Sequence, residues 1–133
     1  MRGAILAGLI VAAAAPALAA GIGAAEAKRT FFSYDMNGYL SGTNEKWREC
    51  VHKDGETTYW FAGKIDQGRM RVSDEGYLCF SYKSTGYQRE GCFTAQRTGS
   101  NWRFTNVDDS ETVFVTTSAK RVKACPAGDD AIS

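Results

Sequence analysis

The sequence is poor in histidine and in proline. Its one histidine is His52, and no proline lies between residues 28 and 125. A Ser–His–Asp or Cys–His catalytic arrangement would need His52 as its base. The position of His52 beside Asp54-Gly55, a strong turn signal, indicates a solvent-facing hairpin residue instead. We therefore predict no catalytic residue, and a non-catalytic domain is favoured over an enzyme.

The sequence also lacks an excess of charge of either sign. Its formal net charge at pH 7 is +1, with 16 Lys and Arg against 15 Asp and Glu. Nucleic-acid affinity depends on neutralising phosphates, so this balance argues against a nucleic-acid partner. The short basic run Lys120-Arg121-x-Lys123 is interpreted as the polar face of the last strand.

Signatures of metal and cofactor binding are missing as well. The chain has no Cys-x-x-Cys, no pair of histidines and no glycine-rich phosphate loop, which argues against a structural zinc site and a bound nucleotide. Asp108-Asp109-x-Glu111 offers oxygen ligands for a hard cation, but this segment lacks the EF-hand spacing and is interpreted as a turn between two strands. We expect no metal and no cofactor.

The first residues have the organisation of an export signal. Met1-Arg2 is a positive start, residues 4–15 are apolar, and Ala17-Leu18-Ala19 supplies the small residues that a signal peptidase recognises. A second such site is Ala25-Glu26-Ala27. We predict that residues 1–27 are a cleaved signal peptide, with cleavage after residue 19 as the alternative.

The remainder of the chain is interpreted as one exported domain. The apolar part of the leader, about 17 residues, is shorter than the roughly 20 that a membrane-spanning helix needs, so no transmembrane span is expected after processing. No Asn-x-Ser/Thr sequon occurs, which favours the bacterial periplasm, with secretion as the other destination. We predict a single β domain over residues 28–125 and a disordered tail over residues 126–133.

The predicted domain contains four cysteines: Cys50, Cys79, Cys92 and Cys125. An even number of cysteines in an oxidising compartment predicts two disulfides, which can connect in three ways. The residues around Cys79 and Cys92 favour one of these three connectivities.

Residues 77–82 and 88–94 both have the composition of strands, and a glycine-containing turn lies between them. A turn centred on Thr85-Gly86 places Cys79 directly opposite Cys92. Directly opposed residues of an antiparallel pair are close enough for a disulfide after a small local adjustment. We therefore predict the bridge Cys79–Cys92.

The same register places Leu78 opposite Phe93, which gives one face of the hairpin an apolar pair. By elimination the second bridge is Cys50–Cys125. It would tie the beginning of the domain to its end, and the loop-entropy model gives it a stabilising contribution of roughly 4 kcal/mol.

Between the glycines lie short runs rich in Thr, Val, Tyr, Phe and Trp, which predict an all-β fold. Strands are expected at residues 46–52, 56–63, 68–73, 77–82, 88–96, 101–106, 111–117 and 120–124. Turns are expected at Asn37-Gly38, Asp54-Gly55, Asp74-Glu75-Gly76 and Thr98-Gly99-Ser100. No run outside the leader has helical periodicity. The fold class is a small antiparallel meander barrel or sandwich of about 7–8 strands, stapled by disulfides.

Alternation of polar and apolar residues is clearest in two of these strands. In Arg69-Met70-Arg71-Val72 the apolar residues face one way and the arginines the other. Trp102 and Phe104 repeat the pattern, with both predicted to point inward. Such one-faced alternation is typical of an antiparallel sheet with one solvated side.

Residues 68–80, GRMRVSDEGYLCF, followed by Cys92-Phe93, resemble a group of small exported alphaproteobacterial proteins without an assigned function. These proteins share a Gly-x-aromatic-x-Val strand, a turn, a Gly-x-Leu-Cys-Phe strand and a second cysteine one hairpin later. The likeness extends over about residues 40–105. Met70 stands where that strand usually has Trp, and Cys50 and Cys125 are additional. The resemblance implies an exported β domain with a Cys79–Cys92 bridge, and it implies no catalytic residues.

Arginines and aromatic residues are interleaved along the predicted sheet, and they are the candidates for contact with a ligand or partner. The candidate residues are Arg69, Arg71, Tyr82, Arg89 and Arg103. We predict an exported non-enzymatic binding domain for a small ligand or an envelope protein. The alternative is a small exported enzyme, or an inhibitor of one. A cavity inside the barrel would favour ligand binding, and a fully packed core would favour surface docking.

Overall fold

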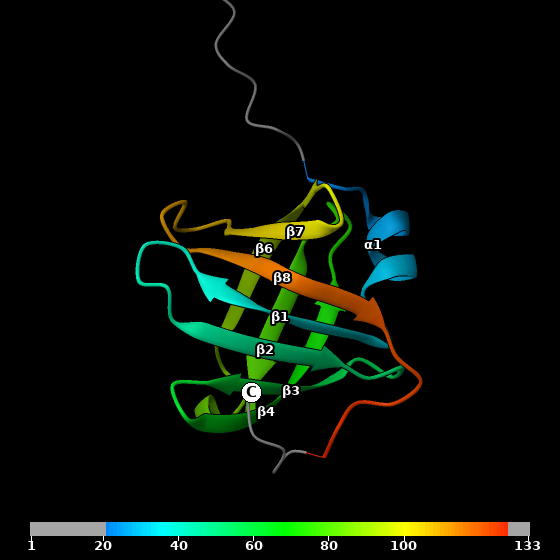
Figure 1. Cartoon of the computed structure of the whole chain (residues 1–133). Coiled ribbons are helices and arrows are strands. Elements are labelled where there is room, and N and C mark those ends of the chain that lie inside the picture. The colour runs from blue at the N-terminus through cyan, green and yellow to red at the C-terminus, as the bar shows by residue number, and fades with distance from the viewer. Residues whose placement is uncertain (1–20, 128–133) are drawn as a thin grey trace, which may run out of the picture.

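The computed structural model describes residues 21–127. Eight antiparallel strands follow one another around a closed barrel (Figure 1). The strands are β1 (Tyr34–Leu40), β2 (Lys46–Val51), β3 (Glu56–Phe61), β4 (Lys64–Val72), β5 (Leu78–Tyr82), β6 (Glu90–Thr98), β7 (Asn101–Asn106) and β8 (Val113–Arg121). A short helix, α1 (Ala24–Thr30), precedes them, and a 3₁₀ turn, η1 (Lys83–Thr85), lies between β5 and β6.

The predicted all-β meander is confirmed, and it is a barrel rather than a sandwich. What closes the barrel is the pairing of the first strand with the last, which runs from Tyr34 opposite Arg121 to Leu40 opposite Phe114. This pairing closes the sheet into a barrel, so it has no free edge strand.

The turn predicted at Asn37-Gly38 is wrong, because these residues lie inside β1. The register with β8 shifts between them, which marks a β-bulge. A Cβ atom at Gly38 would lie 1.7 Å from the carbonyl oxygen of Val115. Glycine is therefore needed at this position for the close approach of two backbones, and not for a chain reversal.

Most of the strand predicted at 111–117 and the first two residues of the one predicted at 120–124 belong to the single strand β8, whereas residues 122–124 follow this strand and are not part of it. Ser118 and Ala119, which were expected to separate the two predicted strands, pair with Asn37 and Met36 of β1. Pairing with a distant strand outweighs the weak strand propensity of these small residues. The helix α1 was also not expected in the domain, since residues 24–27 were assigned to the leader.

Residues 1–20 and 128–133, which include most of the predicted leader and tail, lie outside the described residues. Residues 21–27 are part of the folded unit. Ile22 donates a backbone hydrogen bond of 2.9 Å to the carbonyl of Ala95, and Ala27 is fully buried. Among residues 21–127, no helix is long and apolar enough to cross a membrane.

The helix α1 and the residue that follows it close one end of the barrel (Figure 1). Phe31 is fully buried, with its ring centroid 4.7 Å from that of Trp102 and 5.6 Å from that of Phe104. Trp102 in turn donates a 3.0 Å hydrogen bond from Nε1 to the Tyr34 hydroxyl. The buried hydrophobic cluster comprises Ala27, Phe31, Met36, Trp47, Val51, Met70, Leu78, Ala95, Trp102 and Phe104.

Both predicted disulfides are confirmed. Cys79 of β5 lies directly opposite Cys92 of β6, and Leu78 lies opposite Phe93, as the hairpin register requires. The bridge Cys50–Cys125 joins β2 to the segment that follows β8.

The predicted alternation is confirmed as well. Met70 is buried while Arg69 and Arg71 are exposed, and Trp102 and Phe104 both point into the core.

Candidate functional site

The barrel interior is filled at the α1 end and hollow at the other. The helix contacts the ends of β6 and β8, through Arg97 and Arg121, whereas the cavity is lined by Gly91 and Phe114 at the beginnings of those strands. Its volume is about 250 Å³, just below the usual range of about 300–1,000 Å³ for small-molecule sites. The lining residues are Met36, Trp47, Glu49, Tyr59, Phe80, Tyr82, Thr85, Arg89, Gly91, Phe93, Phe104 and Phe114.

Most of the cavity wall is aromatic. Phe114 contacts Trp47 and Phe93 edge to face, with ring centroids 5.7 and 5.6 Å apart. On the other side of the cavity, the centroids of Tyr59 and Tyr82 are 5.4 Å apart. Phe104, which packs on Phe31, joins the cavity to the packed half of the barrel. These interlocked rings form a wall of fixed shape.

One carboxyl group lies in this apolar wall. On β2, side chains alternate between the interior and the outside, and Trp47, Glu49 and Val51 share the inward face. Glu49 is only 4% exposed. The Tyr82 hydroxyl donates a 2.9 Å hydrogen bond to its Oε2, but Oε1 has no hydrogen-bond partner among the described residues.

The surroundings of Glu49 favour its neutral form. Burial is the main cause, and it raises the pKa of Glu49 to about 8. The hydroxyl groups of Thr57 and Tyr82 act in the opposite direction, and the negative charge of Asp66 adds to the rise. Thr57 is fully buried, and its hydroxyl forms no hydrogen bond of normal geometry in the described structure.

The two tyrosines beside Glu49 remain neutral phenols. Burial and the nearby Glu49 raise the pKa of Tyr59 and the pKa of Tyr82 well above that of a free tyrosine. Both can therefore act as hydrogen-bond donors throughout the physiological pH range.

A glycine on the neighbouring strand makes room for this polar group. A Cβ atom at Gly68 of β4 would lie 2.7 Å from Tyr82 Cδ1 and 2.8 Å from Thr57 Oγ1. Only a residue without a side chain lets the Tyr82 ring lie flat against β4 and reach Glu49.

The structure brings only two of the sequence-predicted site residues to the cavity, Tyr82 and Arg89. Tyr82 is half-buried and bonded to Glu49, and Arg89 is exposed in the loop after η1. Arg69 and Arg71 lie on the outer face of β4, and Arg103 lies on the outer face of β7, three strands away. A single charged face formed by all five residues does not occur.

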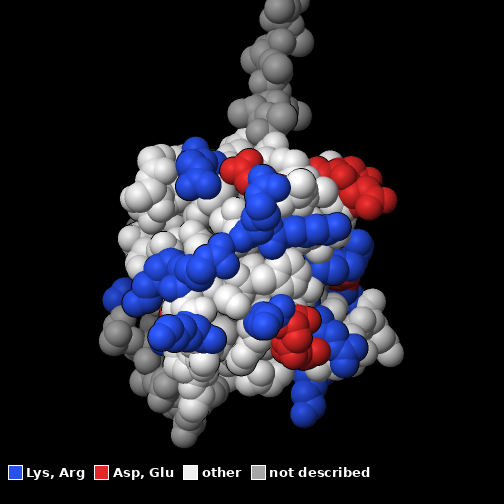
Figure 2. Space-filling view, turned by 90° about the vertical axis from the view of Figure 1, so that its right-hand side faces the viewer, with Lys and Arg blue, Asp and Glu red and all other residues white. Residues whose placement is uncertain are grey.

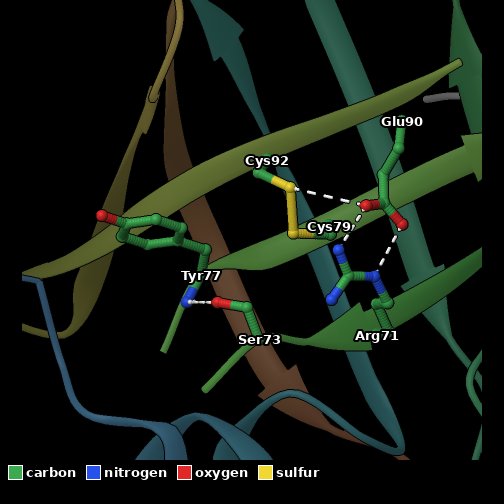
Figure 3. Close-up of polar contacts among 6 residues, drawn as sticks. All are labelled: Arg71, Ser73, Tyr77, Cys79, Glu90 and Cys92. Carbon is green, nitrogen blue, oxygen red and sulfur yellow. Dashed lines mark hydrogen bonds and ion pairs between the residues drawn. A yellow bond between two sulfur atoms is a disulfide. The ribbon is translucent and has the colours of Figure 1, made fainter. Parts of the chain in front are cut away.

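The outward arginines of β4 are occupied by neighbouring side chains. Arg69 Nε lies 3.2 Å from Glu56, and its guanidinium carbon lies 4.3 Å from the Tyr87 ring centroid. Arg71 forms a two-point ion pair with Glu90 of β6 across the outside of β5 (Figure 3). Its Nε donates at 2.8 Å to Glu90 Oε2.

The residues shown in Figure 3 also contain the group most similar in composition to a metal site. Among the described residues, Cys79, Glu90 and Cys92 are the one set of three or more metal-ligating side chains whose ligand atoms lie together. Both sulfurs are bonded to each other, and Glu90 is paired with Arg71. Since a disulfide sulfur is not a thiolate, this group does not have the ligands that a metal ion requires.

The remaining candidates from the sequence are not among the residues that line the cavity. His52 is in the loop between β2 and β3, on the α1 side of the barrel, with Nε2 3.5 Å from the Thr58 hydroxyl. Asp108 and Asp109 lie in the loop between β7 and β8. Their backbone amides donate to the Asn106 side chain, and Asp109 accepts hydrogen bonds from Glu111 and Thr112. This loop is the predicted turn.

Lysines and arginines form a band across the α1 end of the barrel (Figure 2). Lys28 and Arg29 belong to α1 and are exposed. Two further arginines reach the helix: Arg97 lies 3.6 Å from Glu26, and Arg121 donates to the carbonyl of Arg29 at 2.7 Å. The band therefore helps to hold α1 in place.

Sequence reasoning missed most of the cavity, including Glu49. The sequence does contain an indication of the Glu49 position. In Trp47-Arg48-Glu49-Cys50-Val51, the glutamate alternates with the same period as Trp47 and Val51, so it shares their face of the strand. Such a position predicts an inward-pointing carboxyl group. No protein-family model matches this chain, and no curated protein sequence does either. Its function is therefore inferred from the chemistry of the barrel.

Proposed function

We propose that this protein is an exported, non-enzymatic barrel that binds one small, largely apolar molecule in its cavity. The observation that carries the proposal is the aromatic-walled cavity of about 250 Å³ at one end of an otherwise packed barrel. Concave apolar sites with a few converging polar groups are the usual form of small-molecule sites. Here the polar groups are the Glu49 carboxyl and the Tyr82 hydroxyl.

The arrangement of the potential catalytic groups supports binding over catalysis. All four cysteines are in disulfides, so none can act as a thiolate nucleophile. His52 lies at the opposite end of the barrel from the cavity. The two disulfides support export to the periplasm or beyond the cell, since such bridges persist in oxidising compartments.

The cavity favours a small ligand over the envelope-protein partner also considered from the sequence. Arg69, Arg71, Arg97 and Arg121 all form contacts within the protein, so docking would compete with these contacts. A ligand in the cavity would instead cover apolar rings and reach Glu49.

The proposal is tested with 2-phenylethanol, a neutral molecule with one aromatic ring. Binding is followed by calorimetry and by the fluorescence of Trp47, which lines the cavity. The variant Gly91→Leu places a side chain in the cavity, because the nearest atom to a Cβ at Gly91 is 3.6 Å away and belongs to Phe93. The matched control is Ser118→Leu, which adds the same side chain at an exposed position of β8.

We expect wild type and Ser118→Leu to bind 2-phenylethanol with equal affinity, and Gly91→Leu to bind it at least tenfold more weakly. Binding that Gly91→Leu leaves unchanged would overturn the proposal, and so would a wild-type protein that binds neither 2-phenylethanol nor its amine and carboxylate analogues. Circular dichroism of each variant shows whether the barrel has folded.

A further inference from the structure

Glu49 carries the one acidic group among the residues that line the cavity, and its carboxyl is only partly satisfied. Oε2 accepts a hydrogen bond from Tyr82. Oε1 is buried and forms no hydrogen bond of normal geometry among the described residues, although the Thr57 hydroxyl is close enough to lower the pKa of the carboxyl. Because Glu49 is one of the residues that line the cavity, a ligand group that reaches its carboxyl would complete the hydrogen bonding of the site.

The groups that face Glu49 are donors or like charges. Thr57 and Tyr59 come from β3, Tyr82 from β5, and Asp66 from β4. Thr57 and Tyr82 present hydroxyl groups suited to a carboxylate, and Asp66 repels one. No basic side chain of the described chain is among the groups that act on Glu49. The group absent from this environment is a cation.

Besides the Glu49 carboxyl, the aromatic walls of the cavity can also attract a cation. Rings of Trp47, Tyr59, Phe80 and Tyr82 line it, and the faces of such rings attract a cation. A cationic nitrogen at Oε1 would thus meet a carboxylate on one side and aromatic faces around it. The single arginine of the lining, Arg89, is exposed in the loop after η1, and it is not among the groups that shift the pKa of Glu49.

We propose that the ligand of this cavity is a small organic ammonium ion with an apolar body, held by an ion pair to Glu49 and by the aromatic wall. This inference rests on the proposed function, because it names the chemistry of the molecule that the cavity binds. The ammonium group donates to Oε1 while Tyr82 keeps its bond to Oε2. The apolar body lies toward Phe93 and Phe114.

Ionisation of Glu49 gives the proposal a characteristic pH dependence. The carboxyl must lose its proton to pair with a cation, and its pKa is raised to about 8. Ammonium binding therefore releases a proton below pH 8, and affinity rises with pH by up to about tenfold per unit. It levels off above pH 8 until the amine itself loses its proton. A neutral ligand that accepts a hydrogen bond from the protonated acid would show the opposite trend, with affinity falling above pH 8.

The test compares three probes of one shape: 2-phenylethylamine, 2-phenylethanol and phenylacetate. Binding to the wild-type protein is measured by calorimetry at pH 6, 7 and 8. The same titrations are run on Glu49→Gln, which keeps the side-chain shape without the charge, and on Glu111→Gln as a control in an exposed loop.

We expect the amine to bind wild type and Glu111→Gln at least tenfold more tightly than the alcohol at pH 8, with phenylacetate weakest. The advantage of the amine should shrink as the pH falls to 6 and should be lost in Glu49→Gln. Glu49→Gln should still bind the alcohol, which shows that its cavity is intact.

Two results separate the two proposals. If the alcohol binds but the amine binds no more tightly at pH 8, or if Glu49→Gln keeps the preference for the amine, the ammonium inference is wrong and the cavity proposal stands. If none of the probes binds the wild-type protein, both proposals fail.

Discussion

Glu49 places a carboxyl group at a buried, inward-pointing position of a barrel strand. An inward position on a barrel strand is normally apolar, and Glu49 shares its face with Trp47 and Val51. Its carboxyl group is buried, with one oxygen bonded to Tyr82 and the other without a partner. Keeping such a group costs stability whenever it carries charge, because burial disfavours an ionised carboxyl.

This cost predicts how stability depends on pH. The pKa of Glu49 is about 8 in the folded protein and 4.5 for the free group, so between these values the folded state holds a proton that the unfolded state has lost. The contribution of Glu49 to the free energy of unfolding therefore falls as the pH rises from 4.5 to 8, by up to about 1.4 kcal/mol per pH unit. Below pH 4.5 and above pH 8 it is constant.

Urea denaturation at pH 6, 7 and 8 measures this slope. In Glu49→Gln the group cannot ionise, so the fall should be absent and the variant should gain stability relative to wild type with increasing pH. Glu111→Gln, in an exposed loop, should keep the wild-type slope. Parallel curves for wild type and Glu49→Gln would contradict the prediction.

Two inward glycines should respond differently to the same substitution. Gly68→Ala brings a Cβ to 2.7 Å from both the Ser81 carbonyl oxygen and the Tyr82 ring, an overpacking that typically costs about 1–3 kcal/mol. Gly91→Ala meets its nearest atom at 3.6 Å, on the Phe93 ring, and should leave stability equal or slightly improved, since alanine reduces the freedom of the unfolded chain. Urea midpoints compare the two, and equal losses would contradict the account of Gly68.

The position of α1 distinguishes between the two predicted cleavage sites. Its helix spans residues on both sides of the second predicted cleavage site, which follows Ala27. Cleavage there would remove the buried Ala27 and the hydrogen bond from Ile22 to Ala95. Cleavage after residue 19 keeps both. We therefore expect processing after residue 19, so that the mature chain begins at Ala20.

Intact-mass analysis of protein exported to a bacterial periplasm measures the cleavage point. A second measurement compares purified chains that begin at Ala20 and at Lys28. The shorter chain loses half of α1 and the contacts that hold it, and its unfolding free energy should be lower by about 1–3 kcal/mol. Equal stability of the two chains, together with an N-terminus at Lys28, would show that α1 is dispensable.

At the scale of the whole molecule, the barrel has two unlike ends. One end is closed by α1 and carries the basic band (Figures 1 and 2). The other end opens into the aromatic cavity. Closure depends on the pairing of β1 with β8, which joins the beginning of the folded chain to its end. The Cys50–Cys125 bridge joins nearly the same two regions covalently.

The two disulfides should therefore differ in their effect on stability. Cys50 and Cys125 are 75 residues apart, whereas Cys79 and Cys92 are 13 apart. The loop-entropy model makes the longer bridge more stabilising by about 1.5 kcal/mol. Urea denaturation of the two double variants, each pair replaced by alanine, measures the difference. A larger loss from the short bridge would indicate that local packing outweighs the entropy of the unfolded chain.

Neighbouring residues in the chain are enough to predict several features of this protein. Strands such as residues 101–106, the turns after residues 54 and 98, and the inward direction of Met70 and Trp102 follow from alternation and turn residues. The pairing of Cys79 with Cys92 follows from the register of one hairpin. These features need only a few successive residues, so they can be predicted without the fold.

Other features depend on segments that are distant in the sequence and meet only in the folded barrel. Gly38 lies in a bulge and not in a turn because β8, almost 80 residues later, pairs on both sides of it. The cavity exists because α1 and Phe31 fill one end of the barrel and leave the other to residues from every part of the chain. Glu49 has a raised pKa for the same reason: burial by distant strands, and not its own neighbours in sequence, sets the environment of its carboxyl group.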